Sequence, residues 1–232
     1  MGKALRILIV EDSDMDARLL LRTLRAGGID PVYERVDTAE AMQAALDTKP
    51  WDIVLSDYSM PQFDALAALE LAHRKDSDLP FIIISGTVGE DIAVAAMRAG
   101  ASDYFMKGHL LRLIPVIERE LREAAERRAH RQAEGLLQDI IENNPISIQI
   151  VDNEGFTLKT NPAHTALFGS APPVDFSIFA DLKRKIPGFA EILQRAKNGE
   201  AVSFPDIQYN VHDSLPEMPD RPVWVHVTIF QL

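Results

Sequence analysis

The sequence IVLSDYSMPQFD, residues 53–64, carries a carboxylate at Asp57 out of an apolar run and then turns at Pro61. An aspartate at the end of a buried strand has an ordinary explanation, because Asp is a common turn residue. A functional role for Asp57 therefore depends on whether other polar residues converge on it.

Short apolar runs, typical of strands covered on both faces, alternate with helical patterns in the first half of the chain. The expected strands are residues 4–10, 31–36, 53–55, 81–84 and 103–106, and the expected helices are residues 17–24, 38–46, 65–72 and 92–99. This alternation, with short connections, predicts an α/β fold in which a parallel sheet of five strands lies between two layers of helices.

In an open parallel sheet, chemistry takes place beyond the carboxyl ends of the strands. The polar residues expected there are Glu11, Asp12, Asp57, Ser85, Thr87 and Lys107. Each has a separate structural explanation as a helix cap or a solvated charge. Those explanations give no reason for all of these residues to lie at the same edge of the sheet, so we interpret them as one site.

Phosphoryl transfer is the chemistry that suits this set of side chains. Three crowded carboxylates repel one another unless a hard cation neutralises them, and oxygen ligands suit Mg²⁺. The Asp57 carboxylate is then the candidate nucleophile, and Lys107 supplies a positive charge to the phosphoryl oxygens. The Ser85 hydroxyl is a candidate hydrogen-bond donor to the same oxygens.

Four motifs occur together in residues 1–125: the acidic pair in ILIVED, the turn DYSMP, SGT after the fourth strand, and AGASDYFMK into the fifth. In this order and spacing they resemble the receiver domain of two-component response regulators. The resemblance implies a flavodoxin-like fold in which Asp57 accepts a phosphoryl group from a phosphohistidine. The donor would be a histidine kinase or a histidine phosphotransfer protein.

The resemblance also assigns roles to individual residues. It implies that Asp12, Asp57 and the main-chain carbonyl of Ser59 ligate Mg²⁺, with Glu11 helping through water. Phosphorylation would draw the Ser85 hydroxyl inward, and Tyr104, which lies three positions before Lys107, would then change rotamer. A tyrosine that simply packs on residues 92–99 is the alternative for Tyr104.

Two positions depart from the common receiver pattern. Lys107 is followed by Gly108 where the family often has Pro, and Asp64 is followed by Ala65 where it commonly has Gly. Neither change removes a reacting group. The first predicts a different geometry at the entry to the last helix of the receiver.

A helical pattern continues through residues 114–141, beyond the length of a receiver domain alone, and residues 126–142 are the expected linker. Its apolar positions are Ile114, Ile117, Leu121, Ala125, Ala129, Ala133, Leu136 and Ile140. Their spacing is compatible with a solvated connector helix and equally with a two-stranded coiled coil that would make a homodimer.

The remaining residues, 143–232, have a different pattern. Residues 147–151 and 156–160 are expected to form a hairpin around Asp152-Asn153-Glu154-Gly155, and a short helix begins at Asn161-Pro162. The sequence IQIVDNEGFTLKTNPAHTALFG resembles the opening of a PAS domain, a small antiparallel sheet flanked by helices. A further helix at residues 189–196 and strands at residues 201–210 and 223–230 are expected. A PAS fold usually has a fifth strand, so we expect the chain to be a fragment with an output domain beyond Leu232.

Composition excludes several classes of function. The net charge of −11 does not provide the positive field that general nucleic-acid or anionic-membrane binding needs, so neither partner is expected. The absence of cysteine excludes disulfides, thiolate metal sites and flavin-adduct photochemistry. The first apolar run breaks at Glu11, too early for a signal peptide or a membrane span, and we expect a cytoplasmic protein.

The histidines do not indicate a cofactor or a kinase. His164 and His212 are candidate haem ligands, but isolated histidines more often fill a core or a surface. His130 lies in AHRQAEG, which lacks the acidic residue and the later proline of a phosphorylated kinase histidine, and there is no Gly-rich loop for ATP. The PAS-like part is therefore expected to act in protein interaction and dimerisation, and a small-molecule pocket stays open.

The main hypothesis is a phosphorylation-controlled signalling module, a phosphoacceptor rather than a turnover enzyme, although the full-length protein could carry a kinase or cyclic-dinucleotide output domain. One alternative is a Mg²⁺-dependent aspartyl phosphatase. Such enzymes generally place a second acid two residues after the nucleophile, where this chain has Ser59. The other alternative is a receiver-like docking scaffold that is never phosphorylated.

Overall fold

The computed structural model describes residues 4–61, 63–86 and 90–231, so the predicted site residue Thr87 lies outside the described residues. The chain divides into two compact units, Met1–Gln132 and Ala133–Leu232. In the part of the chain that the structure describes, no helix combines the length and apolar character needed to cross a membrane.

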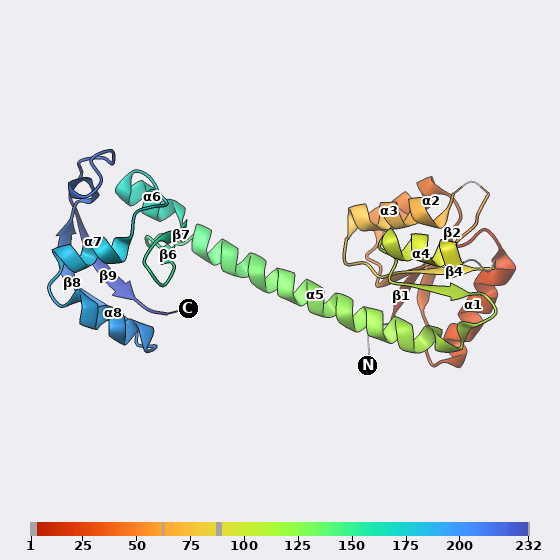
Figure 1. Ribbon diagram of the computed structural model, residues 1–232. Helices are drawn as coiled ribbons and strands as arrows, with labels where there is room; N and C mark the ends of the chain where they lie inside the picture. The colour runs from red at the N-terminus through yellow and green to blue at the C-terminus, as the bar shows by residue number, and fades with distance from the viewer. Residues whose placement is uncertain (1–3, 62, 87–89, 232) are drawn as a thin grey trace. The chain divides into compact units, whose positions relative to one another are not determined.

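The first unit is built on a parallel sheet of five strands in the order β2-β1-β3-β4-β5 (Figure 1). The strands are β1 (Arg6–Val10), β2 (Val32–Val36), β3 (Ile53–Asp57), β4 (Phe81–Ser85) and β5 (Asp103–Met106). This is the flavodoxin-like strand order, in which the chain changes direction across the sheet between β1 and β3. The predicted α/β fold is confirmed.

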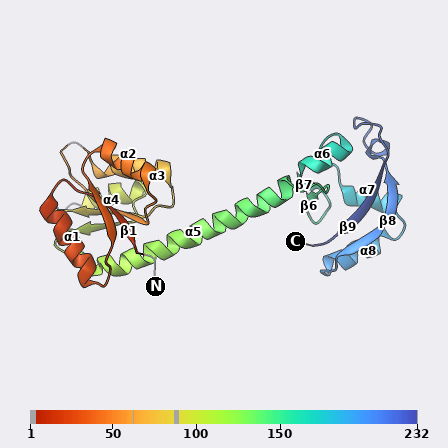
Figure 2. The same cartoon turned by 180° about the vertical axis from the view of Figure 1, so that it is seen from behind.

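Helices cover both faces of this sheet. They are α1 (Asp14–Ala26), α2 (Ala39–Thr48), α3 (Ala65–Lys75), α4 (Glu90–Arg98) and α5 (Leu113–Glu142). Apolar residues of α2, α3 and α4 pack in one buried cluster, and those of α1 and the start of α5 pack in another. Figures 1 and 2 show the corresponding two layers from opposite sides.

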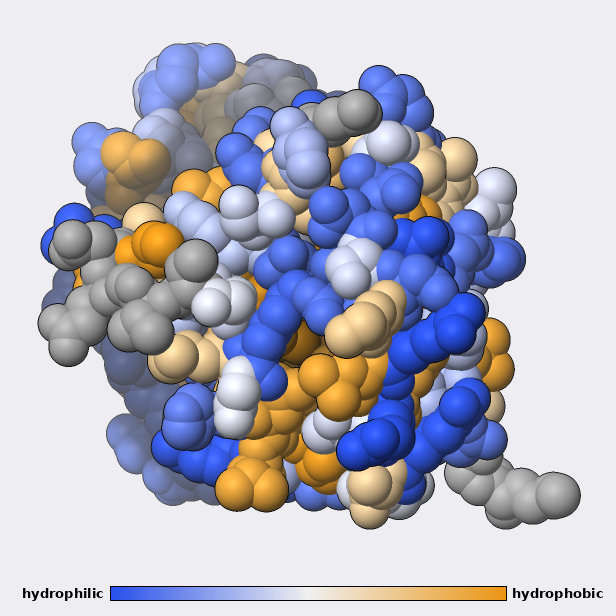
Figure 3. Space-filling view, turned by 90° about the vertical axis from the view of Figure 1, so that its right-hand side faces the viewer, coloured by the Kyte–Doolittle hydropathy of each residue, from blue (hydrophilic) through white to orange (hydrophobic). Residues whose placement is uncertain are grey.

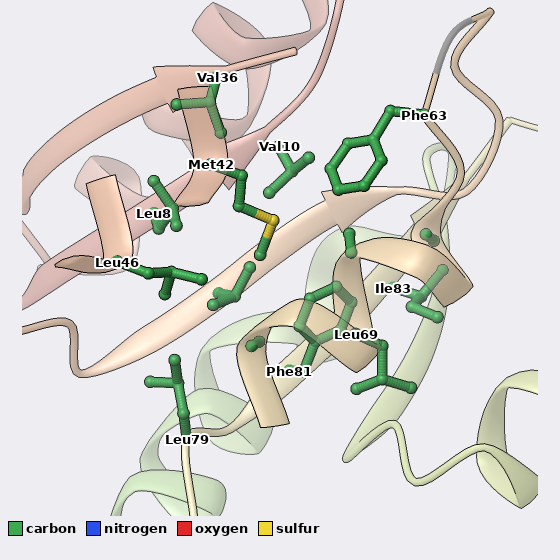
Figure 4. Close-up of a cluster of buried hydrophobic side chains, with 14 of the residues drawn as sticks. Leu8, Val10, Val36, Met42, Leu46, Phe63, Leu69, Leu79, Phe81 and Ile83 are labelled. Carbon is green, nitrogen blue, oxygen red and sulfur yellow. The ribbon is translucent and has the colours of Figure 1, made fainter. Parts of the chain in front are cut away.

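Alternation of side chains along each strand supplies both clusters. Leu8 and Phe81 point into the first cluster, whereas their neighbours Ile7 and Ile82 point into the second. Figure 4 shows the first cluster, where Met42 of α2 and Leu69 of α3 meet the strand residues. Because both faces are covered, the central strands β1, β3 and β4 are largely apolar, whereas the edge strand β2 carries Glu34 and Arg35 in its interior.

The helices begin where a side chain caps them. The side chains of Ser13, Thr38 and Asp64 accept hydrogen bonds from the first-turn N–H groups of α1, α2 and α3. The turn aspartate Asp64 therefore has a structural role as the cap of α3, and its carboxylate accepts from Ala67 N–H at 2.8 Å.

Helix α5 differs from the predicted apolar seam in its first turns. Ile117 is fully buried in the second cluster, and Ile114 and Leu121 pack against it. These residues cover the sheet and are not available to a partner helix. Farther along α5, Leu136 and Ile140 are 62% and 53% exposed.

Ion pairs hold the middle of α5 against the rest of the first unit. Arg127 and Arg131 both contact the buried carboxylate of Asp78, at 3.3 and 2.9 Å, and Arg128 contacts Asp76 at 2.8 Å. These contacts join α5 to the segment between α3 and β4. They explain why the first compact unit extends to Gln132.

Over its described residues, the second unit contains the end of α5, two antiparallel strand pairs, three further α-helices and a 3₁₀ helix, Val211–Asp213. Its elements are β6 (Gln149–Val151), β7 (Thr157–Thr160), α6 (Pro162–Phe168), α7 (Ile178–Lys185), α8 (Phe189–Lys197), β8 (Val202–Tyr209) and β9 (Val223–Ile229). Among the described residues, β6 pairs only with β7 and β8 only with β9, so the single small sheet expected from the sequence is present as two separate antiparallel pairs. The sequence also gave no expectation of α7.

Asn161 organises the beginning of this unit. Its buried side-chain amide donates to the carbonyls of Ile141, Asn144 and Ile146, and its amide oxygen accepts from Ile148 and His164 N–H. One side chain therefore ties the end of α5 to the hairpin and to α6, which it also caps.

Candidate functional site

Strand register places the predicted residues together. Val10 of β1 lies opposite Ser56 of β3, so Glu11 and Asp57 leave the sheet side by side. On the other side of β3, Asp57 lies opposite Ile84, the residue before Ser85. Their meeting point is between β1 and β3, where the strand order changes direction and α/β sheets bind their ligands.

Lys107 reaches this point from the loop after β5. Its Nζ lies 2.9 Å from Glu11 Oε2, 3.2 Å from Asp57 Oδ2 and 2.5 Å from Asp16 Oδ2. The Lys107 main-chain N–H donates to the Ser85 carbonyl at 2.8 Å, which fixes the start of the loop against β4. The lysine therefore faces the acids instead of bulk water.

Glu11, Asp12 and Asp57 form the acidic cluster expected from the sequence. Each offers a carboxylate oxygen, and these oxygens all lie within 4.8 Å of one another. The Glu11 and Asp57 side chains are only 7% and 10% exposed. The other Asp57 oxygen, Oδ1, accepts from the Tyr58 N–H at 2.8 Å, which orients the carboxylate.

Electrostatics at the site are shaped by burial and by these contacts. Burial raises the pKa of Glu11, and hydrogen bonds from Lys107 and from the Ser13 N–H only partly offset it. Burial lowers the pKa of the Lys107 ammonium, but hydrogen bonds to Asp16 and Glu11 outweigh that effect and hold this pKa above its ordinary value. Lys107 therefore stays positively charged. Burial disfavours the charged form of Glu11, and a bound metal cation would stabilise that form.

The remaining predicted residues lie in different surroundings. Ser85 is buried at the end of β4, 1% exposed. Tyr104 lies in β5 and packs against the first buried cluster. Ser59 is exposed in the segment between β3 and α3. The roles of Ser59, Ser85 and Tyr104 stay predictions.

Two further residues belong to the site, and the sequence analysis missed both. Asp16 of α1 contacts Lys107, and its place in the first turn of the helix that follows the acidic pair was a signal that its carboxylate lies near the same strand end. Arg35 of β2 donates from Nη1 to the Glu11 and Asp12 carbonyls at 2.8 and 3.2 Å. Nothing in the local sequence indicates that contact, because it depends on the pairing of β1 with β2.

Gly108, which follows Lys107 where receivers often have Pro, begins a short connection into α5. A 3₁₀ helix, Leu110–Arg112, precedes α5, and the His109 N–H donates to the Met106 carbonyl at 2.8 Å. Leu111 in this connection is 96% exposed, and Met15 and Leu19 of α1 are 79% and 44% exposed. Figure 3 shows one face of the molecule on which hydrophobic residues (orange) reach the surface between hydrophilic ones (blue).

A parallel sheet with three acids and a lysine at the ends of β1, β3 and β5 is the arrangement of a phosphoryl-accepting receiver. Residues 7–117 match the family model of the response regulator receiver domain. These residues are a receiver domain of two-component signalling. Receiver domains accept phosphoryl groups from histidine kinases or phosphotransfer proteins and generally bind Mg²⁺ in an acidic pocket.

Individual relatives agree with this assignment. The transcriptional regulatory protein PrrA of Mycobacterium leprae is 34% identical over 106 residues, which cover 46% of this chain and 45% of that protein. A chemotaxis protein CheY homolog of Campylobacter jejuni is 27% identical over 105 residues, which cover 44% of this chain and 81% of that protein. The chain therefore spans less than half the length of the PrrA relative.

Among solved structures, NtrX from Brucella abortus, crystallised in complex with ADP, is 27% identical with a TM-score of 0.50. The match covers 62% of this chain and 34% of NtrX. It supports the receiver fold of the first unit.

Proposed function

We propose that Asp57 accepts a phosphoryl group from a phosphohistidine on a histidine kinase or histidine phosphotransfer protein, in a Mg²⁺-dependent reaction. The observation that carries the proposal is the convergence of Glu11, Asp57 and Lys107 at the strand ends. In the transfer, an Asp57 oxygen bonds to phosphorus as the bond between phosphorus and the donor nitrogen breaks, and the imidazole leaves.

The acidic cluster fits a magnesium ion. Its donors are carboxylate oxygens, which Mg²⁺ prefers, and Glu11 is a buried acid whose charge a cation would stabilise. Asp12, Asp57 and the Ser59 carbonyl would hold the ion, with Glu11 contributing through water. When bound, the ion supplies positive charge that offsets the charge of the phosphoryl group.

The chain's own residues position and sense the phosphoryl group. Lys107 Nζ lies 3.2 Å from Asp57 Oδ2, close enough for the ammonium to move to the new phosphoryl oxygens. The Ser85 hydroxyl would donate to the same group and move with its loop. Tyr104, at the edge of the first buried cluster, would then exchange rotamers and change the surface near α4.

Residues 143–232, which lie within the second unit, are proposed to be a PAS-like relay and dimerisation domain, joined to the receiver, residues 1–125, by the helical linker 126–142. Support comes from the order of elements, in which a hairpin is followed by helices and then by a second hairpin. Exposed Leu136, Leu137 and Ile140 on α5 support pairing with a second copy of the chain. Sedimentation of wild type and of Ile140→Glu tests this. Pairing predicts a wild-type dimer that the variant weakens, whereas a solvated connector predicts that both proteins sediment as monomers.

Incubation with acetyl phosphate and Mg²⁺, followed by intact mass measurement, tests the acceptor function. One phosphoryl adduct that is absent in Asp57→Asn and present in the matched control Asp14→Asn supports the proposal. Continuous release of phosphate over many cycles would instead indicate a phosphatase. No adduct and no hydrolysis would leave a docking scaffold.

A further inference from the structure

The contacts of Lys107 are unequal. Its ammonium donates hydrogen bonds to Glu11 and Asp16, whereas its contact with Asp57, at 3.2 Å, is an ion pair. In the unphosphorylated site, therefore, the lysine is held chiefly by acids other than the acceptor.

Asp16 differs from Glu11 in its relation to the metal. Glu11 belongs to the cluster whose oxygens lie close enough to share one cation, together with Asp12 and Asp57. Asp16 lies outside that cluster, in the first turn of α1, where its N–H donates to the capping hydroxyl of Ser13 at 3.3 Å. A bound cation would partly neutralise Glu11 and so weaken its attraction for Lys107. It would not neutralise Asp16, which would still attract the lysine.

A phosphoryl group on Asp57 and the carboxylate of Asp16 would compete for the same ammonium. An ammonium has three N–H donors, and the Glu11 and Asp16 hydrogen bonds occupy two of them, so a phosphoryl group can receive a second hydrogen bond from Lys107 only if one of these acids gives up its own. The Asp16 and Lys107 side chains are 34% and 23% exposed, so their attraction is less screened than that of a surface pair.

We propose that Asp16 is a positioning residue that holds Lys107 in a resting position, from which a phosphoryl group on Asp57 must draw it. The inference rests on the proposed acceptor function and adds a determinant of how readily Asp57 is phosphorylated. Neutralising Asp16 would free Lys107, so the site would bind a phosphoryl group more tightly and acquire it faster. A merely structural role for Asp16 in α1 would give a loss instead.

The test uses beryllofluoride, a phosphoryl analogue, with Mg²⁺ and the full chain. Asp16→Asn is expected to bind it about fivefold more tightly than wild type, the size expected for loss of one partly exposed ion pair. It should also accept phosphoryl groups faster from acetyl phosphate. Asp16→Glu, which restores the charge, should return both values toward wild type.

Asp14→Asn is the matched control. It removes the same charge from the same turn, but Asp14 pairs with Arg18 at 2.7 Å rather than with Lys107. Equal affinities of Asp16→Asn and Asp14→Asn, or a weaker affinity of Asp16→Asn, would overturn the inference while the acceptor function stands. Failure of the wild type to bind beryllofluoride would overturn the proposed function as well.

Discussion

Two aspartates, the half-buried Asp57 of the first unit and the buried Asp181 of the second, have opposite surroundings. Asp181 of α7 is 0% exposed and receives hydrogen bonds from Tyr209 Oη at 2.6 Å and Ser214 Oγ at 2.5 Å. Lys185 and Arg184 lie 3.3 and 3.1 Å from it. Asp57, by contrast, shares its surroundings with Glu11 and Asp12, and its positive neighbour Lys107 is also bound by other acids.

The difference separates a carboxylate whose charge the fold satisfies from the one that we propose as the phosphoryl acceptor. Burial raises the pKa of Asp181, but hydrogen bonds from Ser214 and Tyr209 and the charge of Lys185 outweigh it, and the net pKa lies below its ordinary value. Its charge is therefore satisfied within the fold. The acids around Asp57 repel one another, and a site of this kind gains stability from an added cation.

The largest expected effect is the loss of stability on substitution of Asp181. Asp181→Ala would leave the Tyr209 hydroxyl and the Lys185 ammonium without their acceptor, and the second unit should lose roughly 3–5 kcal/mol of unfolding free energy. Hydrogen exchange of the amides of α7 and β8 under native conditions measures this locally. Asp57→Ala is the control, because Asp57 lies in the other unit and should leave this exchange unchanged. Equal exchange in Asp181→Ala and wild type would mean that the network is not structural.

Mg²⁺ should stabilise the first unit by about 1.4 kcal/mol at ten times its dissociation constant. The gain should be much smaller in Asp57→Asn, which removes one ligand, and intact in Asp14→Asn. Urea unfolding followed by the fluorescence of Trp51, which is 6% exposed, reports on this unit when Trp224 is replaced by Phe. The same gain in Asp57→Asn would show that the ion binds elsewhere.

The smallest effect is a pH dependence of the second unit. His164 is 4% exposed, burial lowers its pKa, and its ring Nδ1 has no hydrogen-bond partner among the residues that the structure describes. Below the ordinary pKa of 6.5 the unfolded chain takes up a proton that the folded unit resists, so stability should fall as pH falls through that range.

His164→Phe keeps an aromatic ring beside Phe168, whose ring centroid lies 4.7 Å from that of His164, and should flatten this pH dependence. Burial also lowers the pKa of His73 in the first unit, so the readout must be local exchange in α6 rather than global unfolding. A pH dependence in α6 that persists in His164→Phe would assign it to another group.

The sequence predicted what local pattern controls. Apolar runs and helical spacing indicated the five strands and the helices of the first unit, because residues close in sequence determine them. The rule that the carboxyl ends of parallel strands gather at one edge then predicted that Glu11, Asp57 and Lys107 lie together.

The features that the sequence did not reveal depend on which strands pair and on which surface a helix packs against. The contact of Arg35 with the acidic loop follows from the pairing of β1 with β2. Ile117 and Leu121, which the helical spacing assigned to a possible seam, instead pack in or against the second buried cluster. The omission of α7 is different, because Ser177 caps it and Ile178 and Leu182 have helical spacing, so the signal was present.

Borohydride trapping tests the central claim most directly. The full chain is phosphorylated with acetyl phosphate in Mg²⁺, the acyl phosphate is reduced to homoserine, and peptide mass spectrometry locates the change. The account predicts homoserine at position 57 alone, formed with Mg²⁺ and not with EDTA. Modification at Glu11 or Asp12, or an adduct that forms equally without the metal, would contradict it.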